Sequence, residues 1–396
     1  MKNISNQNIV FKDKKVLLRV DLNVPMKNGS ITELSRIEKI LPTIKFLINK
    51  KARIIILSHI GRPKGKFIEG MSLKPIKKKL ESLLNKNILF YEKTINENTL
   101  PEINKIQSGS IMMLENIRFN KGEETNDIEF SKNLSNLGDI YVNDAFSCSH
   151  RSHASVEGIT KFIPSYFGLQ ISQEIYALKK ITSEIKKPVT LIIGGSKIST
   201  KINIINNLVK KFDNIVIVGG MANTMLKHTG SKVGKSICEN NCELLIKEIL
   251  EVSKKYNCKI ICPEDVIVSE NVDGNGKGKD INQINENEMI LDIGPKTIST
   301  IKKVINESNT VLWNGPAGYF ENSNFQNGTR EILQTISNKT IKDKIFSVAG
   351  GGETVAAINK FKKLDSFTFV STAGGAFLEY LEGKTLPGIK ALNQNV

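Results

Sequence analysis

Short apolar runs alternate with longer segments of helical periodicity along the whole chain. In the first part, runs rich in Val, Ile and Leu predict β-strands. They cover residues 15–20, 53–58, 87–91, 110–114 and 139–143. Between them, residues 36–50 and 73–85 repeat their apolar positions at the spacing of an amphipathic helix. This alternation predicts an α/β fold with a parallel sheet covered by helices on both faces.

The second part of the chain continues the same alternation. Its predicted strands are 189–193, 214–218, 259–262, 288–292, 309–313, 344–348 and 367–371. At 396 residues the chain exceeds the size at which one hydrophobic core keeps growing, so two domains are expected. In parallel sheets of this kind, ligands bind beyond the carboxyl ends of the strands. The residues at those ends are therefore the candidates for function.

The stretch from Pro188 to Lys201 combines a strand, two glycines and a predicted helix that runs from Ile198 to Phe212. Lys197 and Lys201 lie at the start of that helix, where the helix dipole already disfavours positive charge. Free backbone N–H groups, glycines and two ammonium groups together predict a phosphate site. The alternative is that both lysines simply point into water, as most lysines do.

Basic and hydrogen-bonding residues follow four of the five strands in the first part of the chain. The segments are Arg19-Val-Asp-Leu-Asn-Val-Pro25, His59-Ile-Gly-Arg-Pro63, Glu115-Asn-Ile-Arg-Phe119 and Asp144-Ala-Phe-Ser-Cys-Ser-His-Arg-Ser-His153, and Arg36 opens a helix nearby. A single arginine in a loop is usually a solvated surface residue. Several at one sheet edge predict a cup for a small anionic substrate, because guanidinium groups match phosphate and carboxylate oxygens in pairs.

Most strands of the second part lead into glycine-containing turns, which let backbone approach a flat ligand or its phosphates. Residues 350–354 followed by an apolar helix predict a second phosphate cradle. Two similar segments are excluded as nucleotide sites. Residues 230–236 resemble a Walker A loop but have one residue too few and follow a helix. Residues 274–278 lack a preceding strand and are predicted to form an exposed loop.

Composition excludes several other classes of protein. The net charge of +16 comes from lysines spread among acidic residues, which does not favour a nucleic-acid partner. We find no signal peptide and no run that could span a membrane, so a soluble, cytoplasmic protein is expected. The spacings Cys238-x3-Cys242 and Cys258-x3-Cys262 suggest zinc, but buried packing thiols are the favoured interpretation.

Taken together, these segments resemble the phosphoglycerate kinase family over nearly the whole chain. Beyond the loops quoted above, the matching motifs are Leu114-Glu-Asn-Ile-Arg-Phe119, Asn143-Asp-Ala-Phe146, Gly194-Gly-Ser-Lys197, Leu312-Trp-Asn-Gly-Pro316, Gly350-Gly-Gly352 and Leu378-Glu-Tyr-Leu-Glu-Gly-Lys384. The resemblance implies two doubly wound, Rossmann-like domains joined by a hinge. It places a 3-phosphoglycerate domain at residues 1–170, a nucleotide domain at 171–375 and a C-terminal segment, 376–396, that returns to the first domain.

The resemblance also implies roles for individual residues. Those implied for 3-phosphoglycerate or 1,3-bisphosphoglycerate are Asp21, Leu22, Asn23, Arg36, His59, Ile60, Gly61, Arg62, Arg118 and Arg151. Those implied for ATP or ADP are Lys201, Glu321, Gly351, Gly352, Glu353 and Thr354. Arg36, Lys197 and Lys201 are the implied catalytic residues. Magnesium is implied as the magnesium-nucleotide complex, with no direct protein ligand, although Glu353 could reach it, and a monomer is expected.

The chain departs from the family pattern at three positions near the implied nucleotide site. Val218 and Ala373 stand where the family commonly has glycine, and Glu353 stands where it usually has aspartate. Two alternative functions can be weighed against the sequence. A dehydrogenase would need a Gly-x-Gly-x-x-Gly turn after a first strand, and we find none. A basic nucleic-acid-binding protein would show steeply salt-dependent binding to a polyanion.

Overall fold

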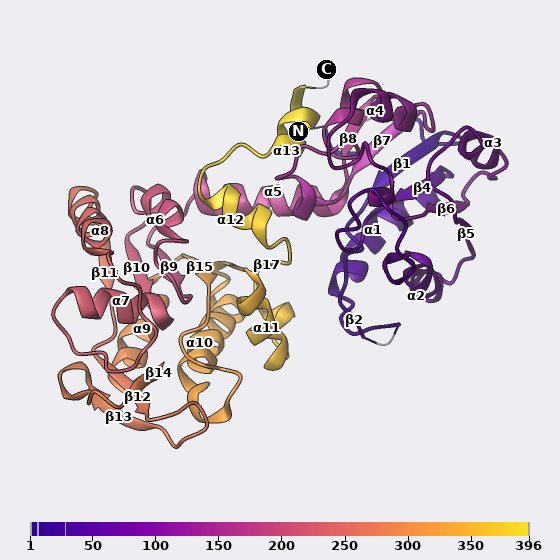
Figure 1. Ribbon diagram of the computed structural model, residues 1–396. Helices are drawn as coiled ribbons and strands as arrows, with labels where there is room; N and C mark the ends of the chain where they lie inside the picture. The colour runs from indigo at the N-terminus through magenta and orange to yellow at the C-terminus, as the bar shows by residue number, and fades with distance from the viewer. Residues whose placement is uncertain (1, 6–7, 28, 395–396) are drawn as a thin grey trace. The chain divides into compact units, whose positions relative to one another are not determined.

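The computed structural model describes residues 2–5, 8–27 and 29–394 (Figure 1). The chain divides into two compact units, which we call unit 1 (Met1–Ile175 with Thr385–Val396) and unit 2 (Tyr176–Lys384). Helix α5 (Leu169–Thr182) runs through the boundary in the sequence. Each unit contains a six-stranded parallel sheet, which confirms the predicted α/β class.

The sheet of unit 1 has the strand order β5-β6-β4-β1-β7-β8. Its strands are β1 (Lys15–Arg19), β4 (Arg53–Leu57), β5 (Ile88–Tyr91), β6 (Ile111–Leu114), β7 (Ile140–Asn143) and β8 (Ser165–Phe167). Every residue of β6 and β7 is buried, so helices and loops cover both faces of the sheet. The first five strands match the predicted runs. The sequence pattern missed β8, which is too short to show a period.

The helices of unit 1 are α1 (Ser35–Asn49), α2 (Lys74–Leu84), α3 (Thr99–Asn104), α4 (Ile128–Ser135) and α13 (Pro387–Gln394). Short 3-10 helices cover η1 (Glu69–Met71), η2 (Ile117–Phe119), η3 (Phe146–Cys148) and η4 (Gly158–Lys161), and β2 (Met26–Lys27) pairs with β3 (Ser30–Ile31). Helix α13 contacts β8 and η4, and the Gly388 amide donates to the Ser149 carbonyl at 2.9 Å. Helix α13 therefore packs within unit 1.

The sheet of unit 2 has the order β11-β10-β9-β15-β16-β17. Its strands are β9 (Val189–Ile193), β10 (Asn214–Ile217), β11 (Lys259–Ile261), β15 (Thr310–Asn314), β16 (Phe346–Gly350) and β17 (Phe369–Ser371). The helices are α6 (Ile202–Leu208), α7 (Gly219–His228), α8 (Glu243–Lys255), α9 (Pro295–Glu307), α10 (Asn327–Asp343), α11 (Gly352–Lys360) and α12 (Gly375–Leu381), with η5 (Ile281–Gln283), η6 (Ser323–Phe325) and η7 (Leu364–Ser366). All of β9 is buried, as predicted for a central parallel strand.

The predicted strand at residues 288–292 does not belong to the parallel sheet. The observed strand β14 (Met289–Ile293) pairs antiparallel with β12 (Asp265–Ser269), which in turn pairs with β13 (Lys277–Asp280). The prediction that residues 274–278 form only a loop is therefore wrong for Lys277 and Gly278. An apolar run shows that a strand is buried, but it does not show which sheet the strand joins.

Unit boundaries differ from the domain limits taken from the resemblance. Unit 1 extends to Ile175, and residues 376–384 belong to unit 2 instead of the returning segment. The reason is a local contact, because α12 packs on α6 and the Asn207 side-chain amide donates to the Leu381 carbonyl at 2.7 Å. The chain from Thr385 onwards lies in unit 1.

Candidate functional site

Two groups of residues gather at the carboxyl edges of the two sheets, one in each unit. In unit 1 the strands β6, β4, β1 and β7 are neighbours, so the loops that follow them meet. The Asn23 side-chain oxygen, after β1, accepts from the Gly61 amide, after β4, at 3.1 Å. Gly61 has φ +63, and a Cβ there would lie 2.7 Å from the sulfur of Met71. This turn therefore requires glycine.

Arg118 joins the same group from η2, after β6. Its guanidinium donates to the Gly61 carbonyl at 2.6 Å and lies 3.5 Å from a carboxylate oxygen of Glu124. The side chain is only 2% exposed, and its Nη2 atom has no hydrogen-bond partner among the described residues. A buried guanidinium nitrogen that lacks an acceptor favours an incoming anion.

Arg36, at the start of α1, is held in a defined position. Its Nη1 atom lies 3.0 Å from a carboxylate oxygen of Asp21 and 2.9 Å from the Asn23 carbonyl. Asp21 is buried and also accepts from the Ser147 hydroxyl. Leu22, between them, lies in the hydrophobic core, and its amide donates to the Ser58 hydroxyl at 3.0 Å. The predicted residues Asp21, Asn23 and Arg36 thus form one hydrogen-bonded unit.

His59 and His153 are held neutral at this edge of the sheet. Burial, with the charges of Arg19, Arg118 and Arg151, keeps the pKa of His59 well below its usual range. Burial, with Arg118 and Arg19, lowers the pKa of His153 to about 3. Neutral imidazoles can still donate one hydrogen bond each. The local positive charge therefore belongs to the arginines, and the histidines fit a role in binding.

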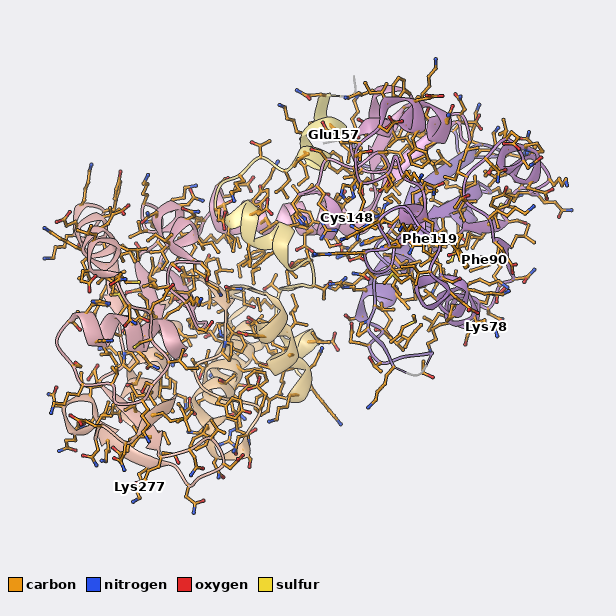
Figure 2. The ribbon with its side chains drawn as sticks, viewed as in Figure 1. Lys78, Phe90, Phe119, Cys148, Glu157 and Lys277 are labelled. Carbon is orange, nitrogen blue, oxygen red and sulfur yellow. The ribbon has the colours of Figure 1, made fainter. Side chains whose placement is uncertain are left out.

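The other predicted residues of this group lie on the same loops. Ile60 is buried and Arg62 is exposed, both beside Gly61, while Arg151 is half-buried and its Nε atom lies 3.2 Å from Nε2 of His150. Figure 2 labels Phe119, the neighbour of Arg118 in η2, and Cys148, whose sulfur lies 3.6 Å from Nη2 of Arg19. The structure brings the predicted cup together within unit 1, with Arg62 at its solvent side.

In unit 2, Lys201 lies beside the carboxyl ends of β9 and β15. Its ammonium group donates to the Gly194 carbonyl at 2.8 Å and to the side-chain oxygen of Asn314. Burial lowers the pKa of Lys201 to about 8, and the Glu353 carboxylate opposes this shift. Lys201 is therefore fixed next to the glycine turn, is mostly charged at neutral pH and loses its charge as the pH rises through about 8.

Helix α6 begins at Ile202, later than the helix predicted from Ile198. The Ser199 amide and hydroxyl both donate to the Glu239 carboxylate, and the Thr200 hydroxyl donates to the Lys197 carbonyl. Such side-chain hydrogen bonds compete with the first turn of a helix. Lys197 consequently lies exposed on a turn, and Lys201 stands immediately before the helix.

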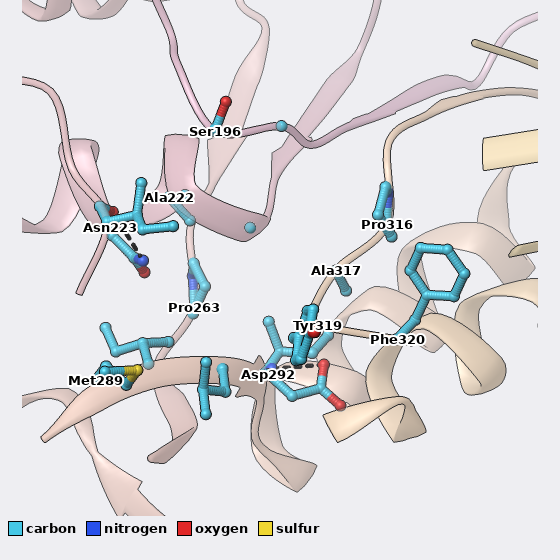
Figure 3. A pocket seen from close by; sticks show the side chains of 18 of the residues that line it. Ser196, Ala222, Asn223, Pro263, Met289, Asp292, Pro316, Ala317, Tyr319 and Phe320 are labelled. Carbon is cyan, nitrogen blue, oxygen red and sulfur yellow. Dashed lines mark hydrogen bonds between the residues drawn. The ribbon is translucent and has the colours of Figure 1, made fainter. Parts of the chain in front are cut away.

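A cavity of about 530 Å³ opens beside these turns (Figure 3). In the figure, Ser196, Ala222 and Asn223 lie on one side, and Pro316, Ala317 and Tyr319 lie on the other. The predicted residues Glu321 and Glu353 also line it. Its other walls are largely apolar, as in the pockets that hold flat organic ligands.

The glycine turn after β16 is held by Asn314 and Thr354. Gly351 has φ +96 and a Cβ there would meet the side-chain amide of Asn314, so the position requires glycine. Asn314 donates to the Gly350 carbonyl at 2.6 Å, and the Gly315 amide donates to the Thr354 hydroxyl at 2.7 Å. Thr354 thus fastens the turn. Gly352 opens α11, with free space where a side chain would stand.

The sequence analysis missed three residues of this site. Asn314 connects Lys201 to the glycine turn, and Lys235 and Asp292 line the cavity. Lys235 belongs to the Walker-like segment that we excluded. Asp292 is buried in β14, accepts from the Gly328 amide at 2.7 Å, and has its pKa raised to about 7 by burial. A polar residue at the end of a buried strand was the available signal for Asn314 and Asp292.

Two of the departures near the nucleotide turns have a structural explanation. Val218 has φ −132, which any residue adopts, and its side chain is fully buried, so a glycine is not required there. Ala373 is buried and does not have a positive φ, so a glycine is not required there either. Glu353 is exposed at the edge of the cavity.

The five cysteines are free thiols. Cys242 and Cys258 are buried, which agrees with the packing interpretation, whereas Cys238 and Cys262 are partly buried. Within residues 2–5, 8–27 and 29–394 no three His, Cys, Asp or Glu side chains are arranged to hold a metal ion. Magnesium commonly uses only one or two carboxylates together with substrate phosphates. Glu353, which lies near enough to Lys201 to affect its pKa, fits that kind of site.

Comparisons with known proteins agree on one family. The family model described as phosphoglycerate kinase matches residues 6–384. Proteins named phosphoglycerate kinase from Chelativorans sp. and from Wolbachia pipientis are each 46% identical over 383 residues, which cover 96% of both chains. The solved structure of phosphoglycerate kinase from Coxiella burnetii is 40% identical with a TM-score of 0.90, and covers 99% of this chain and 98% of its own.

Proposed function

Because the chain belongs to the phosphoglycerate kinase family, we propose that it transfers a phosphoryl group reversibly between 1,3-bisphosphoglycerate and ADP. The products are 3-phosphoglycerate and ATP. The family establishes a phosphotransferase of glycolysis, and the dehydrogenase and nucleic-acid alternatives are set aside on that ground. The proposed reaction and its residue roles rest on one observation, that the two units carry different kinds of functional residues. Unit 1 holds the arginine cup, and unit 2 holds the glycine turns, Lys201 and the cavity.

We assign 3-phosphoglycerate to unit 1. The buried guanidinium of Arg118 supplies an open donor, and Arg62 and Arg151 lie on adjacent loops. These three suit the phosphate of the substrate, whose charge does not change during transfer. Arg36, fixed by Asp21, suits the carboxylate end, where the new bond forms. The remaining cup residues are Asp21, Asn23 and His59, with Leu22, Ile60 and Gly61 contributing backbone.

We assign ATP or ADP to the cavity of unit 2. The apolar walls suit the base, Glu321 suits the ribose hydroxyls, and Gly351 to Thr354 with Lys201 suit the phosphates. Magnesium, bound through the nucleotide, would neutralise phosphate charge, with Glu353 as the nearest candidate ligand. Lys197, exposed on its turn, is assigned to the phosphoryl group in transit.

In the ATP-consuming direction, a carboxylate oxygen of 3-phosphoglycerate attacks the γ-phosphorus, and the bond from that phosphorus to the bridging oxygen breaks to release ADP. The acceptor carboxylate is already ionised at neutral pH, so no general base is needed. Catalysis then consists of alignment and of neutralising charge on the moving group. Because the two ligands are assigned to different units, transfer requires the two units to hold the reacting atoms within about 3.5 Å of each other, which we propose occurs by closure of the two domains.

A coupled assay with ATP, magnesium and 3-phosphoglycerate tests this function directly. We expect turnover that requires all three components. Small-angle scattering tests the movement, because the particle should contract most when substrate and nucleotide are both present. A particle of unchanged dimensions under all conditions would contradict domain closure without affecting the family assignment. The monomeric state and cytoplasmic location remain predictions. No helix within the described residues is long and apolar enough to cross a membrane.

Nucleotide binding is expected to weaken as the pH rises through about 8. Lys201 has its pKa lowered to about 8 in the ligand-free protein, and a polyphosphate beside it would favour the charged form. The complex then binds more protons than the free protein, so affinity falls with pH. The loss should reach roughly tenfold between pH 7 and pH 9. Calorimetry in buffers with different ionisation enthalpies would count the protons taken up.

The matched variant for this experiment is Lys201→Met, which removes the titrating group and keeps a long side chain. Its nucleotide affinity should be lower than that of the wild type at pH 7 and nearly constant up to pH 9. The nucleotide phosphates are fully ionised above about pH 7 and do not add to the slope. A wild-type affinity that stays constant over this range would show that Lys201 does not contact the phosphates.

Glu353→Asp is expected to be tolerated and to tighten magnesium-nucleotide binding modestly. Glu353 is exposed at the cavity edge, so shortening its side chain leaves no void, and aspartate is the residue common in the family at this turn. Titration with magnesium-ADP measures the effect, and Glu321→Asp serves as the comparison at the ribose position. A loss of tenfold or more, about 1.4 kcal/mol, would show that the longer side chain is required.

A further inference from the structure

A chain of buried polar groups runs beneath the substrate cup of unit 1. Glu123, Ser155, Arg19 and His59 come from four separate segments, and each is less than about a tenth exposed. The Ser155 hydroxyl donates to Oε1 of Glu123 at 2.7 Å, and the Ser155 amide donates to Oε2 at 2.9 Å. Arg19 Nε donates to the Ser155 hydroxyl at 3.0 Å, and Arg19 Nη2 lies 3.0 Å from Nδ1 of His59.

In this series of four residues, the donor and acceptor of each hydrogen bond follow from the chemistry of the groups that form it. The Ser155 amide and hydroxyl both donate to the Glu123 carboxyl, and burial raises the pKa of this carboxyl while the charge of Arg19 opposes the rise. The single hydrogen of Ser155 is therefore directed to Glu123. The Ser155 oxygen then has only lone pairs to offer to Arg19. A guanidinium only donates, so Arg19 must donate to Nδ1 of His59. Nδ1 therefore carries no proton, and the ring proton of neutral His59 lies on Nε2.

Glu123 is also a buried carboxylate whose charge acts on Arg19. Arg19 is completely buried, Asp21 is a second carboxylate that acts on it, and it also contacts the Val20 carbonyl and the sulfur of Cys148. A buried cation without a counter-charge is costly, so Glu123 keeps Arg19 in place. The resemblance to known enzymes assigns no role to Glu123 or Ser155, and neither faces the open side of the cup.

We propose that Glu123 is a positioning residue which, through Ser155 and Arg19, holds His59 as the neutral tautomer protonated on Nε2. In this state His59 offers an N–H donor to an oxygen of the anionic substrate. Protonation of Nδ1 would direct an N–H group at the Arg19 guanidinium. The consequence for catalysis rests on the proposed substrate site, whereas the tautomer is a property of the ligand-free protein.

Several groups besides Arg19 act on His59. Arg118, Arg151 and His153 disfavour a positive charge on the ring, and the Cys148 sulfur lies 3.9 Å from Nδ1. These groups keep the imidazole neutral, but they do not select between its two tautomers. The contact from Arg19 makes that selection, because it supplies a donor at one nitrogen only.

Nitrogen-15 NMR of the full-length protein labelled at histidine tests the proposal. The chain has four histidines, and a His59→Gln variant identifies the signal of His59. In the wild type we expect Nδ1 to resonate as an unprotonated ring nitrogen and Nε2 as a protonated one, without change from pH 5.5 to pH 8. A protonated Nδ1, or a mixture of the two tautomers, would overturn the proposal.

Two variants test the series of hydrogen bonds that runs from Glu123 to His59. In Ser155→Ala and Glu123→Gln we expect a mixed tautomer or a titrating His59, together with a KM for 3-phosphoglycerate raised about tenfold and kcat changed less than threefold. Ser155→Ala removes a single oxygen and should fold. Ser131→Ala is the matched control, since Ser131 is equally buried but donates to the Asp127 carbonyl at 2.6 Å. It should leave the tautomer and KM unchanged.

The outcomes separate this inference from the proposed function. If both variants retain a pure Nε2-protonated His59, Glu123 has no positioning role, whatever the activity. If the tautomer responds while the wild type shows no turnover with 3-phosphoglycerate, the positioning role stands and the proposed function fails. If Glu123→Gln does not fold, the result for Ser155→Ala tests the positioning role, because this variant interrupts the same series of hydrogen bonds between Glu123 and Arg19.

Discussion

Replacing Arg36 by alanine is expected to lower kcat by about three orders of magnitude while nucleotide affinity changes little. Its guanidinium is fixed between the Asp21 carboxylate and the Asn23 carbonyl, so it needs no reorganisation when charge develops on the phosphoryl group. Losing one such preorganised positive group in a water-excluded site costs roughly 10²- to 10³-fold or more. Steady-state kinetics and magnesium-ADP titration on the same preparation measure the two effects.

Two companion variants make this result specific. Arg36→Lys keeps the charge but cannot bond Asp21 and Asn23 with the same geometry, so an intermediate kcat is expected. Arg53→Ala removes an arginine that begins β4, at the opposite end of the strand from the site, and should leave kcat within about twofold. An Arg36→Ala enzyme with kcat within tenfold of the wild type would contradict the catalytic assignment.

Replacing Arg118 by alanine is expected to raise the KM for 3-phosphoglycerate about 100-fold, which corresponds to roughly 2.7 kcal/mol. The side chain is almost fully buried, and its Nη2 atom lacks an acceptor among the described residues. An anionic oxygen would therefore form a charge-assisted hydrogen bond that solvent does not weaken. The phosphate that it is assigned to bind does not change charge during transfer. The loss should therefore appear more in KM than in kcat.

Arg62→Ala provides the comparison within the same cup. Arg62 is exposed, and exposed charge pairs are screened by solvent, so a smaller increase in KM, about tenfold, is expected. Circular dichroism should confirm that both variants fold, since Arg118 also holds the Gly61 carbonyl. If KM for 3-phosphoglycerate is unchanged in both variants, the arginine cup does not bind this substrate.

Most strands of the two parallel sheets, and their order along the chain, were predictable from the sequence itself. β-branched apolar runs such as Val189–Ile193 are long enough to be buried on both faces, and the period of α1 is distinct from that of a strand. The loops of the first unit were also predictable, because the carboxyl ends of neighbouring parallel strands must meet at one edge. The family followed from the number and order of motifs, and the comparisons confirmed it.

Other features were decided only by the tertiary structure, because they depend on contacts between segments distant in the sequence. The start of α6 was set by Glu239, which binds Ser199 and replaces a helical turn. Strand β14 belongs to the three-stranded antiparallel sheet because it pairs with β12, and no local pattern identified β12. Asn314 became a site residue through two partners, Lys201 and Gly350. The arrangement of Glu123, Ser155, Arg19 and His59 likewise exists only once four segments fold together, because a hydrogen bond forms only where the fold brings donor and acceptor within reach.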